Sequence, residues 1–492
     1  MKKHLTIFLS LILSLNLISQ HDKQKYYPES DPLVLEKLEN WQDLKFGMLM
    51  HWGPYSQWGV VESWSICPED YGWCQRKKTG TPKTYNAYVE AYENLQKTFN
   101  PIKFNPDKMA EAAKNAGMKY LVFTTKHHDG FCMFDTKYTD YKITDSKTPF
   151  STNKKANITK ELFNSYRNEG LWVGAYFSKP DWHSEDYWWH YFPNKDRNVN
   201  YDPEKYPEKW QNFADFTHNQ IMELLTDYGS IDILWLDGGW VMKQSRELIQ
   251  GFYDKRVAKS KTGFMNGTIV NQDIKMDDLV VKARKKQAGL IVVDRAVEGK
   301  NQNYLTPENK VPEKSLPYPW ESCIISGGGW SYTENAKYKS GISTIKMLVD
   351  IVSKGGNLLL NFAPSHDGSL HKDAYKLLEE IGDWMDVNSE AIYSTRAIAP
   401  FKEGKICYTN KKDTKTVYAF YMNDESEKVI PKYINIDSFV PEKGSSVSLI
   451  GSKENLSWEE NGTGIIITVP EKLRNNPPTK YIWCFKIENC EL

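Results

Sequence analysis

Polar residues that can do chemistry follow directly after several short apolar runs of the sequence. They are His51, the pair His127 and His128, Asp237, and the pair Asp294 and Arg295. In a barrel of parallel strands, the residues that follow the strands meet at one end and form the active site. Three of the ten histidines stand at such positions. We therefore expect these three histidines to contact a bound ligand.

The histidines do not have the spacing of common metal ligands. The chain has no H-x-H, H-E-x-x-H or C-x-x-C pattern. Neighbouring side chains of an extended backbone point to opposite faces, so His127 and His128 would point apart if the backbone is extended there. We therefore expect neither a metal site nor a cofactor.

Asp237 ends the apolar run 233–236, and Trp235 lies on the same face of the expected strand. Aromatic residues make up 13% of the chain, and an aromatic wall beside a carboxylate suits the apolar face of a sugar. Asp232 stands at the other end of the same run and should be structural.

Cleavage of a glycosidic bond uses two carboxyl groups, so Asp237 needs a partner. The candidates are Glu298, Glu308 and Glu321. Glu308 ends the irregular segment 304–308, which can reach over the mouth of a barrel. Glu321 follows Pro319 and Trp320 at the start of an apolar run. Spacing alone does not choose between them.

Seven short apolar runs alternate with helical patterns and should position these residues. The runs are 46–51, 120–125, 171–177, 231–236, 289–293, 322–325 and 357–362, and a helix is expected over 106–116 with Asn105 as its N-cap. This alternation predicts an α/β fold, a TIM-like (β/α)8 barrel, with a doubly wound sheet as the alternative. A doubly wound nucleotide enzyme would need a glycine-rich loop where this chain has residues 51–54.

The pattern changes after about residue 398. The runs 405–409, 417–422, 446–450, 464–469 and 481–487 are short and separated by turn residues, which predicts an antiparallel β-sandwich. We expect three parts: a signal peptide over 1–20, a catalytic domain over 21–395 and a β-sandwich domain over 396–492.

The charge and the first residues bear on location and partners. Sixty-three Lys and Arg match 63 Asp and Glu, so neither nucleic acid nor an anionic membrane is an electrostatically favoured partner. A basic start followed by the apolar run 5–17 is typical of an export signal and is too short to span a bilayer. We expect an exported protein, periplasmic or secreted, without a membrane span.

The seven cysteines are too few and too dispersed for a disulfide scaffold. Cys67 with Cys74, and Cys484 with Cys490, are close enough in sequence to pair in an oxidising compartment. Buried free thiols are the alternative.

Eight motifs, in order, resemble those of glycoside hydrolase family 29, the retaining α-L-fucosidases, over essentially the full length after the signal. They are K-F-G-M-L-M-H-W-G, F-N-P-D-K-M-A-E-A-A-K-N-A-G-M-K-Y, K-H-H-D-G-F, L-W-L-D-G, V-D-R, T-P-E, P-W-E and N-L-L-L-N-F-A-P-S-H-D-G. The family's architecture, a catalytic barrel followed by a β-sandwich, agrees with the two patterns above.

The resemblance implies that Asp237 is the nucleophile and Glu308 the general acid/base, with Glu321 in reserve because the acid/base position varies in the family. It also implies that a further set of residues surrounds the sugar: His51, His127, His128, Trp235 and Arg295. The family's early Glu-Trp pair corresponds to Glu62 and Trp64, which Ser63 separates here.

The implied activity is exo-acting release of terminal α-L-fucose from fucosylated oligosaccharides or polysaccharides. Aromatic groups near Trp64 and Phe177 should enclose the C6 methyl group of the sugar. Two alternatives stay open: an α-L-galactosidase, and a non-catalytic carbohydrate-binding protein, against which the presence of Asp237 and Glu308 argues.

Overall fold

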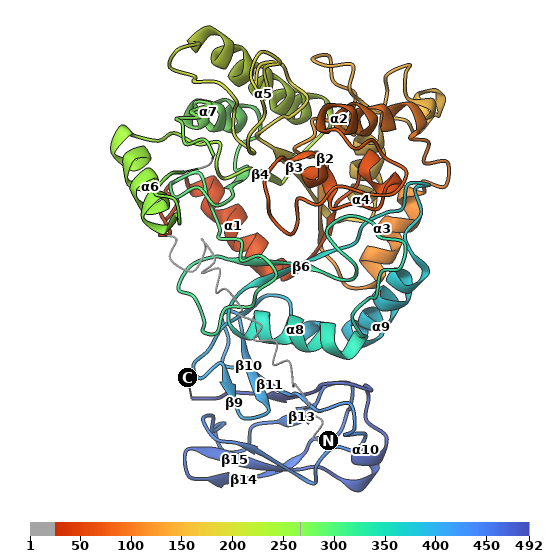
Figure 1. Cartoon of the computed structure of the whole chain (residues 1–492). Coiled ribbons are helices and arrows are strands. Elements are labelled where there is room, and N and C mark those ends of the chain that lie inside the picture. The colour runs from red at the N-terminus through yellow and green to blue at the C-terminus, as the bar shows by residue number, and fades with distance from the viewer. Residues whose placement is uncertain (1–24, 266, 492) are drawn as a thin grey trace, which may run out of the picture.

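A computed structural model describes residues 25–265 and 267–491, and its main body is a curled sheet of seven parallel strands covered by helices (Figure 1). The strands are β1 (Phe46–Met50), β2 (Tyr120–Lys126), β3 (Trp172–Ser178), β4 (Ile233–Asp237), β5 (Ile291–Asp294), β6 (Glu321–Ile325) and β7 (Asn357–Asn361). The helices are α1 (Pro32–Leu44), α2 (Tyr85–Glu93), α3 (Pro106–Asn115), α4 (Ile158–Asn168), α5 (Pro207–Asp227), α6 (Arg246–Lys259), α7 (Met276–Lys286), α8 (Gly341–Ser353) and α9 (Lys372–Asn388).

All seven predicted strands are present, each within about two residues of its expected bounds. The predicted helix is α3, and the Asn105 side chain caps it by accepting from the Lys108 backbone N–H at 3.2 Å. The strand order is β5-β4-β3-β2-β1-β7-β6. This order runs steadily around the sheet and never reverses in its middle, so the sheet is TIM-like and not doubly wound.

An irregular segment takes the place of an eighth strand between β5 and β6. Residues 302–309 bridge both edges: Gln302 pairs with Val293, Leu305 with Trp320, and Glu308 with Cys323. Because Glu308 lies on this segment and not in a regular strand, its position depends on these isolated bridges.

The strands are buried on both faces, as parallel strands covered by helices should be. Tyr120, Tyr176 and Trp235 pack together inside the barrel, whereas the alternate residues pack against the outer helices. Helix α1 contributes to the inner cluster, and its Trp41 stacks on Tyr304 with ring centroids 4.0 Å apart.

The C-terminal part contains two antiparallel sheets that share one apolar core, as predicted for a β-sandwich. The larger sheet holds β8 (Thr395–Arg396), β9 (Lys402–Glu403), β10 (Ile406–Lys411), β11 (Val417–Tyr421), β13 (Val447–Leu449) and β16 (Trp483–Ile487). The smaller sheet holds β12 (Tyr433–Ile436), β14 (Ser457–Asn461) and β15 (Gly464–Thr468), and a short helix α10 (Glu471–Asn475) follows it. The sequence patterns missed β8, β9, β12 and β14, which are very short or largely exposed.

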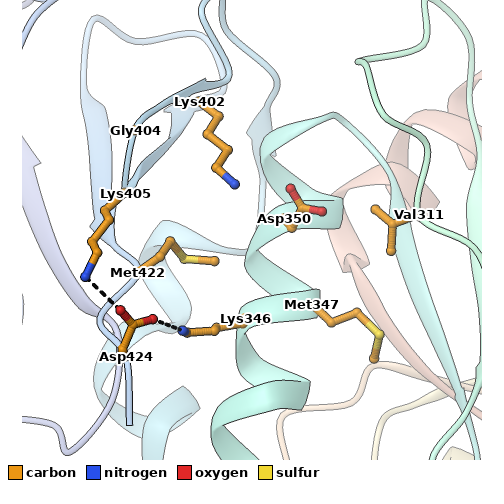
Figure 2. Close-up of a pocket in the computed structure, with 9 residues that line it drawn as sticks. All are labelled: Val311, Lys346, Met347, Asp350, Lys402, Gly404, Lys405, Met422 and Asp424. Atoms are coloured by element: carbon orange, nitrogen blue, oxygen red, sulfur yellow. Dashed lines mark hydrogen bonds and ion pairs between the residues drawn. The ribbon is translucent and has the colours of Figure 1, made fainter. Parts of the chain in front are cut away.

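Helix α8 lies against the larger C-terminal sheet, and a hollow of about 410 Å³ opens at this junction (Figure 2). Lys346 and Lys405 line it, and both pair with Asp424, at 3.4 and 2.9 Å. The predicted catalytic residues do not line this hollow.

The expected export signal, residues 1–20, lies outside the described residues. In the ranges 25–265 and 267–491, the helices lack the length and apolar character needed to cross a bilayer.

All seven cysteines are described, and each is buried with a free thiol. Cys484, on β16, packs in the apolar cluster that the larger sheet shares with the helices of the barrel, and Cys490 packs in the core of the sandwich, so the possible disulfide between them does not form. Cys67 and Cys74 do lie close together, with Glu69, their ligand atoms all within 4.8 Å.

Candidate active site

Asp237 is the last residue of β4 and stands at the C-terminal end of the barrel, where parallel barrels carry their active sites. Three donors hold its carboxylate. Tyr176 donates its hydroxyl to Oδ2 at 2.7 Å, while Arg295 and the backbone N–H of Gly238 donate to Oδ1 at 3.0 and 2.8 Å. The carboxylate is therefore fixed in orientation.

Arg295 joins Asp237 to Glu308. Its Nη1 binds Asp237, and its Nη2 forms an ion pair with Glu308 Oε2. The other Glu308 oxygen accepts from the indole N–H of Trp330 at 3.1 Å. One guanidinium thus brings together two carboxyl groups that lie 71 positions apart in the sequence, and the Glu308 side chain keeps 39% of its surface exposed.

Asp237 and Glu308 share the guanidinium of Arg295, and this positive charge decides the protonation state of Asp237. Burial raises the pKa of Asp237, but the positive charge of Arg295 and the Tyr176 hydrogen bond outweigh burial and hold the pKa well below its usual range. Asp237 is therefore ionised at neutral pH.

The three predicted histidines meet around Asp237. His128 Nε2 lies 3.8 Å from Asp237 Oδ2, and the rings of His127 and His128 are 4.3 Å apart. The pair would point apart on an extended backbone, but β2 ends at Lys126 and the backbone turns there, so both rings face Asp237. Gly130 closes the turn with φ +83°, and a Cβ at this position would collide with Asp181.

Each of these histidines is buried and uncharged at neutral pH. Burial lowers the pKa of His51 to about 4 and that of His128 to about 3, and it lowers the pKa of His127 well below its usual value. Asn361 Oδ1 lies 3.0 Å from His51 Nδ1, and the Ser63 hydroxyl contacts His127 Nδ1. Among the described residues, both rings make these contacts through Nδ1, so Nε2 is left for a ligand.

Glu62 and Trp64 lie on a short 3-10 helix over Glu62–Ile66 beside the histidines. Trp64 meets His128 edge to face, with ring centroids 5.1 Å apart. Burial raises the pKa of Glu62 to about 8, and the charges of Glu308 and Asp237 add to this. Glu62 is therefore protonated at neutral pH, and its Oε1 is buried without a hydrogen-bond partner in the described structure. Ser63, which separates them, turns inward, where its hydroxyl contacts His127.

Four further residues complete the site, and the sequence patterns did not single them out. They are Tyr176, Trp240, Trp330 and Asn361. Tyr176 could have been found, because it lies on the inner face of β3 next to Trp235, with ring centroids 5.2 Å apart. Trp330 lies in a loop and gives no periodic signal.

Phe177 does not contribute to a sugar pocket. It follows Tyr176 on β3 and therefore points to the outer face of the sheet, where the Lys126 ammonium lies 4.2 Å from its ring centroid.

The other two carboxylate candidates, Glu298 and Glu321, lie away from Asp237. Glu298 is exposed and accepts from the Lys25 backbone N–H at 3.0 Å. Glu321 begins β6 at the N-terminal end of the barrel and is fully buried.

Besides Cys67, Glu69 and Cys74, a second side-chain cluster has the spacing of metal ligands, and it lies in this site. Donor atoms of His127, His128 and Asp237 lie within 4.8 Å of one another. Arg295 already binds the Asp237 carboxylate at 3.0 Å, and its positive charge disfavours a second cation at the same oxygen atoms.

The chain is similar to known proteins over nearly its whole length. The sequence profile of the alpha-L-fucosidase family matches residues 13–390, and that of the alpha-L-fucosidase C-terminal domain matches residues 400–488. Plasma alpha-L-fucosidase of Homo sapiens is 27% identical over 497 residues, which cover 95% of this chain and 94% of the human protein. Alpha-L-fucosidase of Branchiostoma floridae is 26% identical and covers 98% of this chain and 99% of its own length.

Solved structures agree. Alpha-L-fucosidase isoenzyme 1 from Paenibacillus thiaminolyticus superposes with a TM-score of 0.71 at 26% identity, covering 94% of this chain and 100% of that one. Thermotoga maritima alpha-fucosidase in complex with fucose gives 0.68 at 25% identity with the same coverage. The barrel, the sandwich and both family profiles lead to one conclusion: this chain belongs to the α-L-fucosidases of glycoside hydrolase family 29.

Proposed function

We propose that this α-L-fucosidase removes terminal fucose from glycans with Asp237 as the nucleophile and Glu308 as the general acid/base. The observation that carries the proposal is the Arg295 guanidinium, which binds both carboxylates at the mouth of the barrel. Retaining glycosidases need two carboxyl groups about 5 to 5.5 Å apart, closer than inverting enzymes do. A shared guanidinium keeps the two groups close.

In the first step, an oxygen of Asp237 attacks the anomeric carbon, and the bond from that carbon to the leaving oxygen breaks. Glu308 gives its proton to the leaving oxygen, so the aglycone departs as a neutral alcohol. The low pKa of Asp237 keeps it unprotonated for this attack. The donors from Tyr176 and Gly238 hold the attacking group in place.

In the second step, Glu308, now a carboxylate, takes a proton from a water molecule. The water oxygen bonds to the anomeric carbon and displaces Asp237, which restores both carboxyl groups to their starting states. The exposed part of Glu308 suits this role, because the group must meet first the aglycone and then water. Two inversions leave the configuration of the sugar unchanged.

Uncharged groups surround the position of the sugar. Neutral His51, His127 and His128 can donate to and accept from hydroxyl groups, and protonated Glu62 can donate. Trp64 offers a flat apolar face. Arg295 lies over the ring of Trp235, with its guanidinium carbon 5.5 Å from the ring centroid.

The test is hydrolysis of 4-nitrophenyl α-L-fucoside followed by proton NMR. We expect α-L-fucose as the first product, before mutarotation. The matching L-galactoside differs only by a hydroxyl at C6, and we expect the L-fucoside to be favoured in kcat/KM by about tenfold or more. Equal or higher efficiency on the L-galactoside would make the chain an α-L-galactosidase. Fucose binding without hydrolysis would make it a binding protein.

We also propose that the chain is exported, on the basis of the basic and apolar pattern of residues 1–20. Expression of the full chain in a bacterium should place the enzyme in the periplasm or medium with a new N-terminus near residue 20. A chain that keeps Met1 in the cytoplasmic fraction would contradict this.

The equal numbers of acidic and basic residues support a neutral glycan as substrate and not a nucleic acid.

A further inference from the structure

An aromatic surface leads away from the catalytic pocket to solvent. Trp64 contacts His128 on its pocket side, with ring centroids 5.1 Å apart. The guanidinium carbon of Arg197 lies 4.6 Å from the Trp64 ring centroid, 5.1 Å from that of Trp240 and 5.6 Å from that of Tyr71. Arg197 therefore connects the wall of the sugar pocket to Tyr71.

Tyr71 continues the surface to Trp73. Their rings are stacked, with centroids 4.6 Å apart and planes 2° from parallel, so they present one flat face. Tyr71 is 49% exposed and Trp73 37%. All 17 tryptophans lie in the described ranges, and Trp73 alone reaches this exposure. Exposing two large rings side by side costs free energy unless a ligand covers them.

The loop that carries these rings is anchored at its base. Glu69 accepts from Arg197 Nε at 2.8 and 3.0 Å and from the Arg197 backbone N–H at 3.2 Å. Cys67 and Cys74 are buried on either side of the exposed pair, and the Cys74 N–H donates to the Tyr71 carbonyl at 3.0 Å. The exposed rings are therefore held by a fixed turn.

We propose that Tyr71, Trp73 and Arg197 bind the sugar residues to which the fucose is attached. This inference rests on the proposed function and names the part of the substrate beyond the fucose. The flat rings pack against the C–H faces of pyranoses. Because the surface starts at Trp64 in the wall of the pocket, it meets the sugars that extend from the fucose out of the pocket. Because Glu69 neutralises Arg197, the surface selects uncharged sugars over sulfated ones.

The test compares two substrates that share the fucose but differ beyond it. α-L-Fucosyl fluoride carries no further sugar, whereas a fucosylated tetrasaccharide extends across the surface. For Tyr71→Ala and Trp73→Ala, we expect the ratio of kcat/KM for the tetrasaccharide to that for the fluoride to fall about tenfold. Trp73→Phe should keep most of the wild-type ratio.

The control is Tyr433→Ala, which removes a 55% exposed tyrosine from β12 in the C-terminal sheet. It should leave the ratio unchanged. An unchanged ratio in both Tyr71→Ala and Trp73→Ala would overturn the proposal. A ratio that falls only for a sulfated tetrasaccharide would overturn the preference for uncharged sugars.

A second measurement separates this inference from the proposed function. Titration of the wild type with the defucosylated trisaccharide should change tryptophan fluorescence, and Trp73→Ala should abolish that saturable change. Failure of the wild type to hydrolyse the fluoride would contradict the proposed function alone. Absence of saturable trisaccharide binding to the wild type would contradict the aromatic surface.

Discussion

Two carboxyl groups lie at opposite ends of the same barrel, Asp237, which is 15% exposed, at the mouth and Glu321, which is fully buried, at the floor. Each accepts a hydrogen bond from a tyrosine hydroxyl, from Tyr176 at 2.7 Å and from Tyr120 at 2.5 Å. Only Asp237 has a cation beside it, because Arg295 follows β5 at the same end of the barrel.

This difference shifts the pKa values of the two carboxyl groups in opposite directions. Burial raises the pKa of Glu321 to about 7, and the hydrogen bond from Tyr120 does not reverse the shift. At Asp237, Arg295 outweighs burial and lowers the pKa. Burial by itself therefore makes a protonated carboxyl group, and a nucleophile needs the cation as well. Four predictions test this contrast.

The largest effect is expected at the mouth. Asp237→Asn removes the attacking oxygen and should lower kcat/KM for an aryl α-L-fucoside by about a thousandfold or more. Azide then attacks from the side of the missing carboxylate, so any rescued product should be the inverted fucosyl azide. The matched control is Asp232→Asn at the other end of β4, where Asp232 pairs with Lys37 at 2.9 Å. Asp237→Asn with more than about a tenth of the wild-type rate would exclude this nucleophile.

The next effect separates Glu308 from Glu321. Glu308→Ala should slow substrates with poor leaving groups about a hundredfold more than activated aryl fucosides, because only the former need a proton. Azide should rescue the activated substrate and give the retained fucosyl azide, since it attacks the glycosyl-enzyme. If Glu321→Ala shows this pattern and Glu308→Ala does not, the two roles are exchanged.

A smaller effect comes from pH and tests the neutral histidines. Because the pKa of Asp237 lies below those of His51 and His128, protonation of the histidines should limit activity in acid. We expect kcat/KM to hold down to about pH 5 and to fall about tenfold per pH unit below pH 4. The folded-state pKa values lie below the unfolded value, so the histidines lose their contribution to stability as pH falls from about 6.5 toward 4. An acid limb near pH 6.5 would contradict neutral burial.

The smallest effect on activity is expected at the floor. Glu321→Gln copies the protonated carboxyl group and should change kcat/KM by less than about threefold. The raised pKa predicts that the wild type loses stability as pH rises through about 7, because the folded-state pKa lies above the unfolded one. Tm of the wild type should therefore fall relative to that of Glu321→Gln between pH 5 and 8. Parallel Tm curves would show that Glu321 does not titrate in this range.

The sequence by itself determined the strands, the order of the parts and several of the polar residues that gather at the mouth of the barrel. Apolar runs that end in His51, His127 or Asp237 mark buried parallel strands and the end of the barrel at which their side chains meet. Eight motifs in order were enough to indicate the family that both profiles then matched. The expected domain limits at 20 and 395 stay predictions.

The tertiary structure decided which residues meet. Periodicity assigns a side chain to a face of a strand, but it does not say which loops come together across the mouth. Arg295 reaches both carboxylates, His127 and His128 turn the same way, and Trp330 binds Glu308 because of isolated bridges and turns without a repeating pattern. The family resemblance favoured Glu308 over Glu321 as the acid/base, and the geometry supports that proposal, because Glu308 lies with Asp237 at the mouth of the barrel whereas Glu321 lies at its floor.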